Sequence, residues 1–202
     1  MAAAVPKLTL RLTPSTKLIL QRGDLTKFSG CAIVNAANER MLGGGGVDGA
    51  IHRAAGPALL EACKEVPQVR PGVRCPTGEA RITPGGDLPA KHVIHTVGPV
   101  YDDAATSGPL LESAYRSSLR LANEHDLRRV AFPAISCGVF GYPLDEAAEI
   151  AVRVSQQEAG KLEEVHFFLF GQPEMEAWIE AAEAAQLEEV AEHQDGRSAG
   201  EL

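Results

Sequence analysis

The sequence predicts an α/β fold, a three-layer α/β/α sandwich in which helices cover both faces of a mixed, largely parallel central sheet. The main observation is that short apolar runs, bounded by turn residues, alternate along the chain with helical stretches. Such alternation is typical of parallel strands buried between layers of helices. A second observation makes the sheet mixed. The first two apolar runs lie too close together for a crossover helix, so we expect that pair to be antiparallel.

The seven expected strands are apolar runs that end at glycine, proline or polar turn residues. In chain order they are Leu8–Leu12, Lys17–Gln21, Cys31–Asn35, Glu79–Thr83, His92–Val97, Val130–Ile135 and Val165–Phe170. His92 and His95 lie three positions apart in the fifth run. That spacing places them on opposite faces of a strand, so the pair does not form a site by itself.

Four stretches predict helices: Val47–Cys63, Leu110–His125, Leu144–Ala159 and Pro173–Val190. The second carries an apolar stripe at helical spacing, formed by Leu111, Ala114, Tyr115, Leu119 and Ala122. The fourth begins with a proline, which is tolerated in the first turn because its missing N–H would have no partner there. The sequence contains no internal repeat.

The length of 202 residues suits one well-cored domain. We place it at residues 8–190, between an N-terminal extension of residues 1–7 and a polar tail of residues 191–202 that we expect to be disordered. No apolar run approaches the roughly 18–20 residues that cross a bilayer. The four cysteines form no C-x-x-C pair and no zinc pattern.

These features predict an intracellular monomer, cytoplasmic or nuclear, with no membrane partner and with reduced cysteines. Import into an organelle stays open, because a targeting segment could lie outside this sequence. The net charge is −8, and residues 158–202 hold 12 acidic and 2 basic side chains. The acidity is therefore a C-terminal property. It argues against nucleic acid at that end and does not oppose an anionic ligand elsewhere.

The segment after the third expected strand carries the strongest functional signal. Asn35 and Asn38 end the strand region, four glycines follow at Gly43–Gly46, and the next helix carries Asp48 and His52 on one face. Glycines let a backbone approach a diphosphate, and free N–H groups at a helix start bind anions. The alternatives are a flexible connector and, for the aspartate, a helix-dipole partner worth roughly 0.3–1 kcal/mol. The combination favours a phosphorylated ligand with chemistry beside it.

A second glycine-containing loop, Ser136–Gly141, follows the sixth expected strand. Because the carboxyl ends of parallel strands meet at one edge of a sheet, we expect the two loops to grip one diphosphate from opposite sides. Cys137 in this loop could act as a nucleophile. No base lies nearby in the sequence, so a small buried thiol is the favoured interpretation.

Two further residues follow expected strands and could contact a base. Asp24 either caps a turn or accepts a hydrogen bond from an exocyclic amine. Phe170 is either a core residue or a stacking platform. The residues alone leave these alternatives open.

Four stretches of the chain together resemble the macrodomain family, and specifically its MacroD-type branch. Their order and spacing agree with that family over roughly residues 8–185. The matching stretches are Gly23–Thr26, the run Ile33–Asn38 with Gly43–His52 and Ala54–Gly56, then Leu88–Pro99, and finally Phe132–Pro143. The resemblance implies a macrodomain-like fold that binds ADP-ribose and hydrolyses its esters, without a cofactor and without a metal.

The resemblance also implies roles for individual residues. Asp24 would accept the adenine amino group, Leu25 would add a backbone contact, and Phe170 would line the adenine pocket. The other ligand-binding positions are Asn35, Gly44, Gly45, Gly46 and Val47 on one side and Ser136, Cys137, Gly138, Val139 and Phe140 on the other. Asn38, Asp48 and His52 match the catalytic positions.

The implied substrates are mono-ADP-ribosylated Asp or Glu side chains of proteins and O-acetyl-ADP-ribose. A water held between the ligand phosphate and Asp48 would attack the ester, while Asn38 holds the distal ribose hydroxyls and His52 supports the arrangement. The alternatives are a non-catalytic ADP-ribose reader and a phosphatase for ADP-ribose 1″-phosphate; removal of ADP-ribose from nucleic-acid ends is a related reaction. A pure reader could lack Asn38 and Asp48, so their presence favours the hydrolase.

One position departs from the family pattern, in which the second loop usually reads Ser-Thr-Gly. Here the loop reads Ser136-Cys137-Gly138. A cysteine serves as well if the position contributes its backbone N–H. A lost hydroxyl contact would weaken affinity by roughly 0.5–1.5 kcal/mol.

Overall fold

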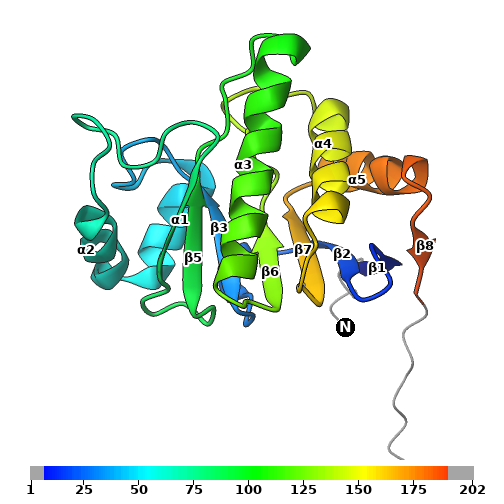
Figure 1. The fold of residues 1–202 in the computed structure, drawn as a ribbon, viewed down its shortest axis with the longest axis horizontal. Helices are drawn as coiled ribbons and strands as arrows, with labels where there is room; N and C mark the ends of the chain where they lie inside the picture. Colours follow the sequence, from blue (N-terminus) through cyan, green and yellow to red (C-terminus); the bar gives the residue numbers. More distant parts are fainter. Residues whose placement is uncertain (1–6, 191–202) are drawn as a thin grey trace, which may run out of the picture.

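The computed structural model describes residues 7–190, which form one continuous sheet flanked by helices (Figure 1). In chain order the elements are β1 (Lys7–Arg11), β2 (Lys17–Arg22), the 3₁₀ helix η1 (Leu25–Lys27), β3 (Ala32–Ala36), α1 (Gly46–Ala55), α2 (Pro57–Glu65), β4 (Ala80–Pro84), β5 (His92–Thr96), α3 (Ala104–Glu124), β6 (Arg129–Phe132), α4 (Leu144–Gln157), β7 (Glu164–Leu169), α5 (Gln172–Ala184) and β8 (Glu188–Glu189). None of these helices combines the length and apolar character needed to span a bilayer.

The sheet is mixed, with a parallel centre and antiparallel edges. Its strand order is β4-β5-β3-β6-β7-β2-β1-β8. The strands from β5 to β2 in that order pair in parallel, whereas β4, β1 and β8 pair antiparallel with their neighbours. The predictions of a largely parallel sheet and of an antiparallel first pair are confirmed. The parallel centre matters for function, because it brings the carboxyl ends of β2, β3, β6 and β7 to one edge.

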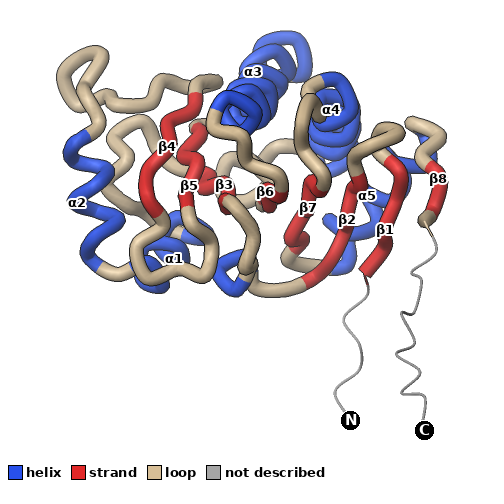
Figure 2. Tube along the Cα trace, turned by 60° about the horizontal axis from the view of Figure 1, so that its bottom comes forward, coloured by secondary structure: helices blue, strands red, loops and turns tan. Residues whose placement is uncertain are grey.

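Helices cover both faces of the sheet, with α3 and α4 on one side and α1 on the other (Figure 2). Four fully buried aromatic side chains form the centre of the first layer: Tyr115 on α3, Phe132 on β6, Phe167 on β7 and Trp178 on α5. The centroids of contacting rings lie 5.5 to 6.1 Å apart. A separate cluster holds α1 and α2 against β3 and β5. The predicted α/β/α sandwich is therefore confirmed.

The helix expected over Val47–Cys63 is wrong as a single element, because the chain breaks it into α1 and α2. Gly56 stands between them with φ 70° and ψ −175°, a conformation open essentially to glycine alone. Pro57 then occupies the first turn of α2, where its fixed φ suits a new helix. The Gly56-Pro57 pair is a sequence signal for this break, but the apolar periodicity continues across it and therefore predicted one helix.

Two other helix boundaries differ from the prediction by more than two residues. The helix expected at Leu110–His125 begins earlier, at Ala104, because the Asp103 side chain accepts a hydrogen bond from the Thr106 N–H and caps it. The helix expected to run from Pro173 to Val190 ends at Ala184. The chain then forms β8, which the sequence prediction missed and which pairs with β1.

The expected strands are all present, with ends shifted by a few residues. The largest shift is at the run Val130–Ile135, whose strand β6 ends at Phe132 because Pro133 follows. Lys7, which we assigned to the N-terminal extension, is the first residue of β1. The rest of that extension and the tail of residues 191–202 lie outside the described residues.

Replacing Gly56 with alanine tests the break between α1 and α2. Gly56→Ala is expected to lower the free energy of unfolding by about 1–3 kcal/mol, because alanine is strained at this positive φ. Its Cβ would also lie 2.5 Å from Asp87 Oδ2. The matched control is Gly108→Ala inside α3, where the nearest atom to a Cβ is Tyr142 Oη at 3.8 Å. The control should be neutral or stabilising by up to about 1 kcal/mol in urea unfolding. Equal losses in both variants would contradict the prediction.

Candidate functional site

A cleft with a volume of about 1220 Å³ opens where the segments after β2, β3, β6 and β7 converge. Most of the residues indicated by the sequence line it: Asp24, Leu25, Asn38, Gly44, Gly45, Gly46, Val47, Asp48, Ser136, Cys137, Gly138, Val139, Phe140 and Phe170. Asn35 and His52 are not part of the lining. They approach the cleft through Asp48, which both of them contact.

The first glycine loop leads from β3 into α1 and forms one wall of the cleft. Gly43 and Gly46 have φ values of 86° and 56°, which favour glycine. Gly45 is the N-cap of α1 and carries no side chain to shield the unpaired N–H groups of the first turn. Gly44 has no room for a side chain either, since a Cβ would lie 2.9 Å from Asp48 Oδ2. The wall is thus bare backbone at a helix N-terminus, which suits an anion.

Asp48 is the buried carboxylate of the site, with 3% of its surface exposed. Its Oδ1 accepts a hydrogen bond of 2.8 Å from the Asn35 amide, and its Oδ2 lies on the side of Gly44, at the cleft. Burial raises the pKa of Asp48, while the Asn35 hydrogen bond and the nearby His52 act in the opposite direction. Asn35 thus holds Oδ1 by a hydrogen bond, while Oδ2 is on the cleft side of the carboxylate.

His52 and Asn38 flank this carboxylate without bonding to it. His52 lies one helical turn after Asp48, and its Nε2 is 3.4 Å from Asp48 Oδ1, yet the atom forms no hydrogen bond within the described part of the chain. Asn38 donates to the Gly43 carbonyl at 3.1 Å and accepts from the Arg40 N–H. Asn38 therefore fixes the glycine loop, and its side chain lies at the surface of the cleft.

The second loop forms the facing wall and is held from both sides. Ser136 adopts φ 66°, which is uncommon for a residue with a side chain. It packs so closely on Gly98 that a Cβ there would lie 2.1 Å from Ser136 Oγ. The Ser136 carbonyl accepts from the Tyr142 N–H, and the Phe140 carbonyl accepts from the Tyr101 N–H at 2.9 Å. The neighbouring segments thus fix the shape of this loop.

Cys137 is a protonated thiol in this loop. Burial, with a smaller effect of the Glu174 carboxylate, raises the pKa of Cys137 to about 12. Its Sγ donates to the Ile135 carbonyl at 3.5 Å, and its backbone N–H donates to the Ala134 carbonyl. These features support the interpretation as a structural thiol and argue against a nucleophile. Because the N–H is already engaged, a backbone contact with a ligand would require this bond to open.

The far end of the cleft is formed by the segments after β2 and β7. Asp24 is the N-cap of η1, where its Oδ1 accepts from both the N–H and the hydroxyl of Thr26. These bonds, chiefly the one from the hydroxyl, lower the pKa of Asp24. Leu25 is buried beneath this wall, whereas Phe170 is 92% exposed at the edge of the cleft. Of the two interpretations of Phe170, the core residue is wrong.

The cleft also contains residues that the sequence analysis missed: Arg22, Gly23, Thr26, Ala36, Ala37, Ala50, Gly98, Pro133, Ala134, Phe168 and Glu174. Phe168 could have been found, because it lies two positions before Phe170 on the same face of the β7 segment. Gly98 directly follows an expected strand. Among residues 7–190, no three His, Cys, Asp or Glu side chains are grouped to hold a metal ion.

Two backbone walls at the carboxyl edge of a parallel sheet, with a buried carboxylate between them, are typical of α/β proteins that bind phosphorylated ligands. The model of the Macro domain family matches residues 34–151, and the chain belongs to that family.

Named relatives agree with this assignment. A macro domain-containing protein of Vibrio parahaemolyticus is 55% identical over 162 residues, covering 80% of this chain and 95% of its own length. An O-acetyl-ADP-ribose deacetylase of Salmonella gallinarum is 58% identical over 140 residues, covering 69% of this chain and 77% of its own.

Solved structures show the same fold. The Oceanobacillus iheyensis macrodomain with ADP has a TM-score of 0.85 at 39% identity, covering 91% of this chain and 98% of that one. The Trypanosoma brucei macrodomain in complex with ADP-ribose has a TM-score of 0.73 at 42% identity, covering 82% of this chain and 68% of that one.

The raised pKa of Asp48 predicts a stability gain when the charge is removed. The folded protein binds the Asp48 proton more tightly than the unfolded chain, so this group lowers stability as pH rises from its ordinary pKa of 3.8 through the folded value. Asp48→Asn should therefore melt at a higher temperature than wild type at pH 7, and the gain should shrink toward pH 4. Melting curves between pH 4 and 8 measure this difference. A gain that stays constant over this range would exclude burial of the charge as its cause.

A matched pair of glycine substitutions tests the packing of the first loop. In Gly44→Ala the new Cβ would meet Asp48 Oδ2 at 2.9 Å and Asn38 Nδ2 at 3.2 Å, so both side chains must shift. At Gly45 a Cβ would meet nothing within 4 Å. We expect Gly44→Ala alone to move the NMR signals of the Asn38 amide and the Asp48 carboxyl. Equal displacement in Gly45→Ala would show that the close packing is not the cause.

Proposed function

We propose that this protein is an ADP-ribosyl ester hydrolase, which removes ADP-ribose from mono-ADP-ribosylated acidic side chains and deacetylates O-acetyl-ADP-ribose. The observation that carries the proposal is the arrangement of Asp48. Its carboxylate lines the cleft that the two loops form, with Oδ1 held by Asn35 and Oδ2 on the side of Gly44.

Ligand binding is supported by both the cleft and the relatives. The Oceanobacillus and Trypanosoma macrodomains are solved with ADP and with ADP-ribose, and this chain has the same fold. A diphosphate between the loops would lie against the N-terminus of α1 and against Ser136–Phe140. The adenine would then reach Asp24 and Phe170 at the far end, and the distal ribose would lie beside Asn38.

The hydrolytic step needs one water and one proton acceptor. The water oxygen bonds to the carbonyl carbon of the ester, and the bond from that carbon to the ribose oxygen breaks. The products are a carboxylate, ADP-ribose with its free hydroxyl, and one proton. Asp48 and the ligand phosphate orient the water and accept its proton. An ordinary aspartate is a weak base, and the burial that raises the pKa of Asp48 makes it a better one. Orientation by fixed neighbours supplies the remainder.

The name O-acetyl-ADP-ribose deacetylase, carried by relatives at 58% identity, supports hydrolysis of an ester on the distal ribose. Other relatives carry the family name alone, so a reader that binds without turnover is the competing function. The buried carboxylate favours the hydrolase. A reader has no need of a charge held at the cost of desolvation.

Asp48→Ala is the decisive variant for this proposal. It should lower release of free ADP-ribose from a Glu/Asp-modified protein, and of acetate from O-acetyl-ADP-ribose, by about 100-fold or more. Binding of ADP-ribose, measured by calorimetry, should persist, because the backbone walls remain. The control variant is Asp126→Ala. Asp126 follows α3, is exposed and pairs with Lys161, so its removal should leave turnover unchanged.

The same assay separates the competing functions. Wild-type protein that binds the modified target without releasing ADP-ribose would be a reader. Release of inorganic phosphate from ADP-ribose 1″-phosphate, with esters left intact, would identify a phosphatase. Unchanged ester turnover in Asp48→Ala would contradict the role given to that residue.

A further inference from the structure

A buried polar chain extends from Asp48 away from the cleft, formed by Asn35, His95 and Thr83. The Asn35 amide nitrogen, which donates to Asp48, also lies 3.2 Å from His95 Nδ1. His95 Nε2 lies 3.0 Å from Thr83 Oγ1, and that hydroxyl donates to the Pro84 carbonyl at 3.2 Å. Asn35 and His95 are fully buried and Thr83 is 4% exposed. These polar groups are placed among the apolar residues that hold α1 and α2 on the sheet.

The sheet register creates this chain. Asn35 on β3 and His95 on β5 are direct partners in the parallel pair. Thr83 on β4 is the partner of Val93, which lies two positions before His95 on the same face. The three polar side chains are therefore neighbours across three strands, on the face that carries α1.

The protons of the chain can be assigned from its end groups. An ionised Asp48 only accepts, so the Asn35 amide must turn its NH₂ group toward it. The second N–H of that group meets His95 Nδ1, which must accept and therefore carries no proton. The His95 proton is therefore on Nε2, which lies 3.0 Å from Thr83 Oγ1 and 3.7 Å from Cys63 Sγ. Burial, with a smaller effect of His52, lowers the pKa of His95 to about 3, so the ring is neutral. One of its two nitrogens is therefore unprotonated and can accept a hydrogen bond.

Asp48 and His95 together set the orientation of the Asn35 amide, because its one NH₂ group faces both acceptors. The carbonyl oxygen of that amide, Oδ1, is buried and has no hydrogen-bond partner within residues 7–190. Among the described residues, then, the amide is not held in place by a hydrogen bond to Oδ1. A turned amide would point its oxygen at the Asp48 carboxylate, and two acceptors would face each other.

We propose that His95 is a positioning residue for Asp48: its Nδ1 lone pair holds the Asn35 amide in the orientation that donates to the carboxylate. This inference rests on the proposed hydrolysis for its effect on turnover, but its effect on Asp48 itself can be measured without any substrate. The groups around the carboxylate are His52 on α1, Cys63 on α2, Asn35 on β3 and the charge of Arg74 near Cys63. Of these, Asn35 is the hydrogen-bond donor.

The first test observes the wild-type protein. In ¹⁵N NMR, His95 should show a protonated Nε2 and an unprotonated Nδ1 throughout pH 5 to 8. A proton on Nδ1, or titration of the ring in this range, would overturn the proposal, because Nδ1 could then not accept from Asn35.

The second test removes the acceptor. In His95→Leu the pKa of Asp48, followed by the ¹³C signal of its carboxyl carbon, should rise, because the amide loses one of the two acceptors that hold it as a donor. The acid limb of the pH profile of kcat should move up by about one pH unit, which is about tenfold lower turnover at a pH below that limb. In His95→Asn, an amide oxygen can occupy the place of Nδ1, and both measurements should return toward wild type.

Two further variants separate positioning from packing. Val93→Ala removes buried volume on the same strand and face, so it should lower stability and leave the Asp48 pKa unchanged. Asn35→Leu should raise the Asp48 pKa as His95→Leu does, and the double variant should add nothing, since both act through one hydrogen bond.

The outcomes are distinguishable. An Asp48 pKa that is unchanged in His95→Leu, or displaced equally in Val93→Ala, would overturn the positioning role. Wild-type protein that hydrolyses no ester, yet shows the displaced Asp48 pKa in His95→Leu, would refute the proposed function and leave this inference standing.

Discussion

The hydrogen bond from Asn35 to Asp48 is the interaction on which the site depends. It joins the carboxyl end of β3 to the first turn of α1 across the glycine loop, with a length of 2.8 Å. A carboxylate that is 3% exposed would be unfavourable without such a donor. Because one oxygen is held in this way, the position of the helix N-terminus and the direction of the other oxygen are set together.

The two walls of the cleft follow from this arrangement and from the parallel sheet. β3 and β6 are neighbours with the same direction, so the loops that leave them rise side by side. Each loop depends on a glycine, Gly44 within the first loop and Gly98, after β5, beside the second. Gly44 leaves room for Asp48, and Gly98 leaves room for Ser136. Close packing at these two glycines therefore maintains the cleft. The parallel strands bring residues that are far apart in the sequence to the same cleft.

The sequence was sufficient for features that depend on local pattern. Apolar periodicity located the strands, and the glycines with Asp48 indicated a segment that lines the cleft. Features set by tertiary contacts were not predictable. β8 is two residues long and exists because β1 offers it a free edge. The break at Gly56 is a different case: the local Gly56-Pro57 pair signals it, but the apolar stripe that continues past this pair predicted one helix. Phe168 was missed although it lies two positions before Phe170, on the face that the strand period predicts for both.

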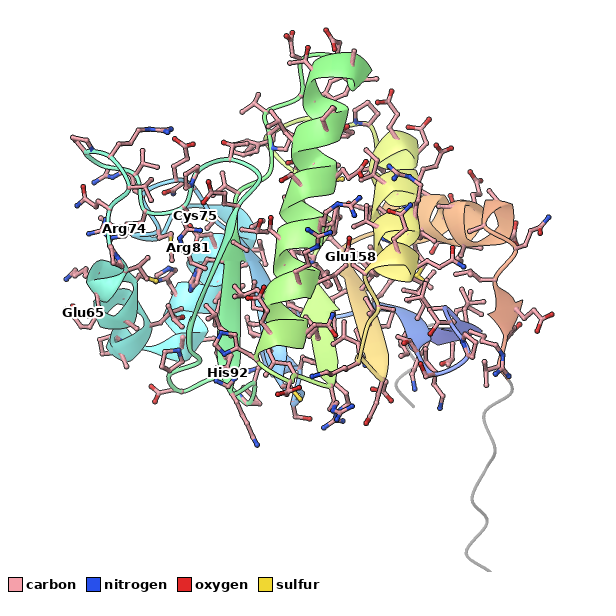
Figure 3. All side chains as sticks on the ribbon, viewed as in Figure 1. Glu65, Arg74, Cys75, Arg81, His92 and Glu158 are labelled. Carbon is pink, nitrogen blue, oxygen red and sulfur yellow. The ribbon has the colours of Figure 1, made fainter. Side chains whose placement is uncertain are left out.

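His95 shows the limit of the same reasoning in the site itself. Its spacing from His92 implied opposite faces, and Figure 3 shows His92 at the amino end of β5. His92 does not line the cleft. The spacing could not show that the register pairs His95 with Asn35. Once paired, a neutral histidine inside an apolar cluster becomes, with Asp48, one of the two acceptors that hold the Asn35 amide in place. Buried polar groups act as a unit in this way, because each must satisfy the next where water is absent. The environment of Asp48 is then set by three strands and one helix, as much as by the aspartate itself.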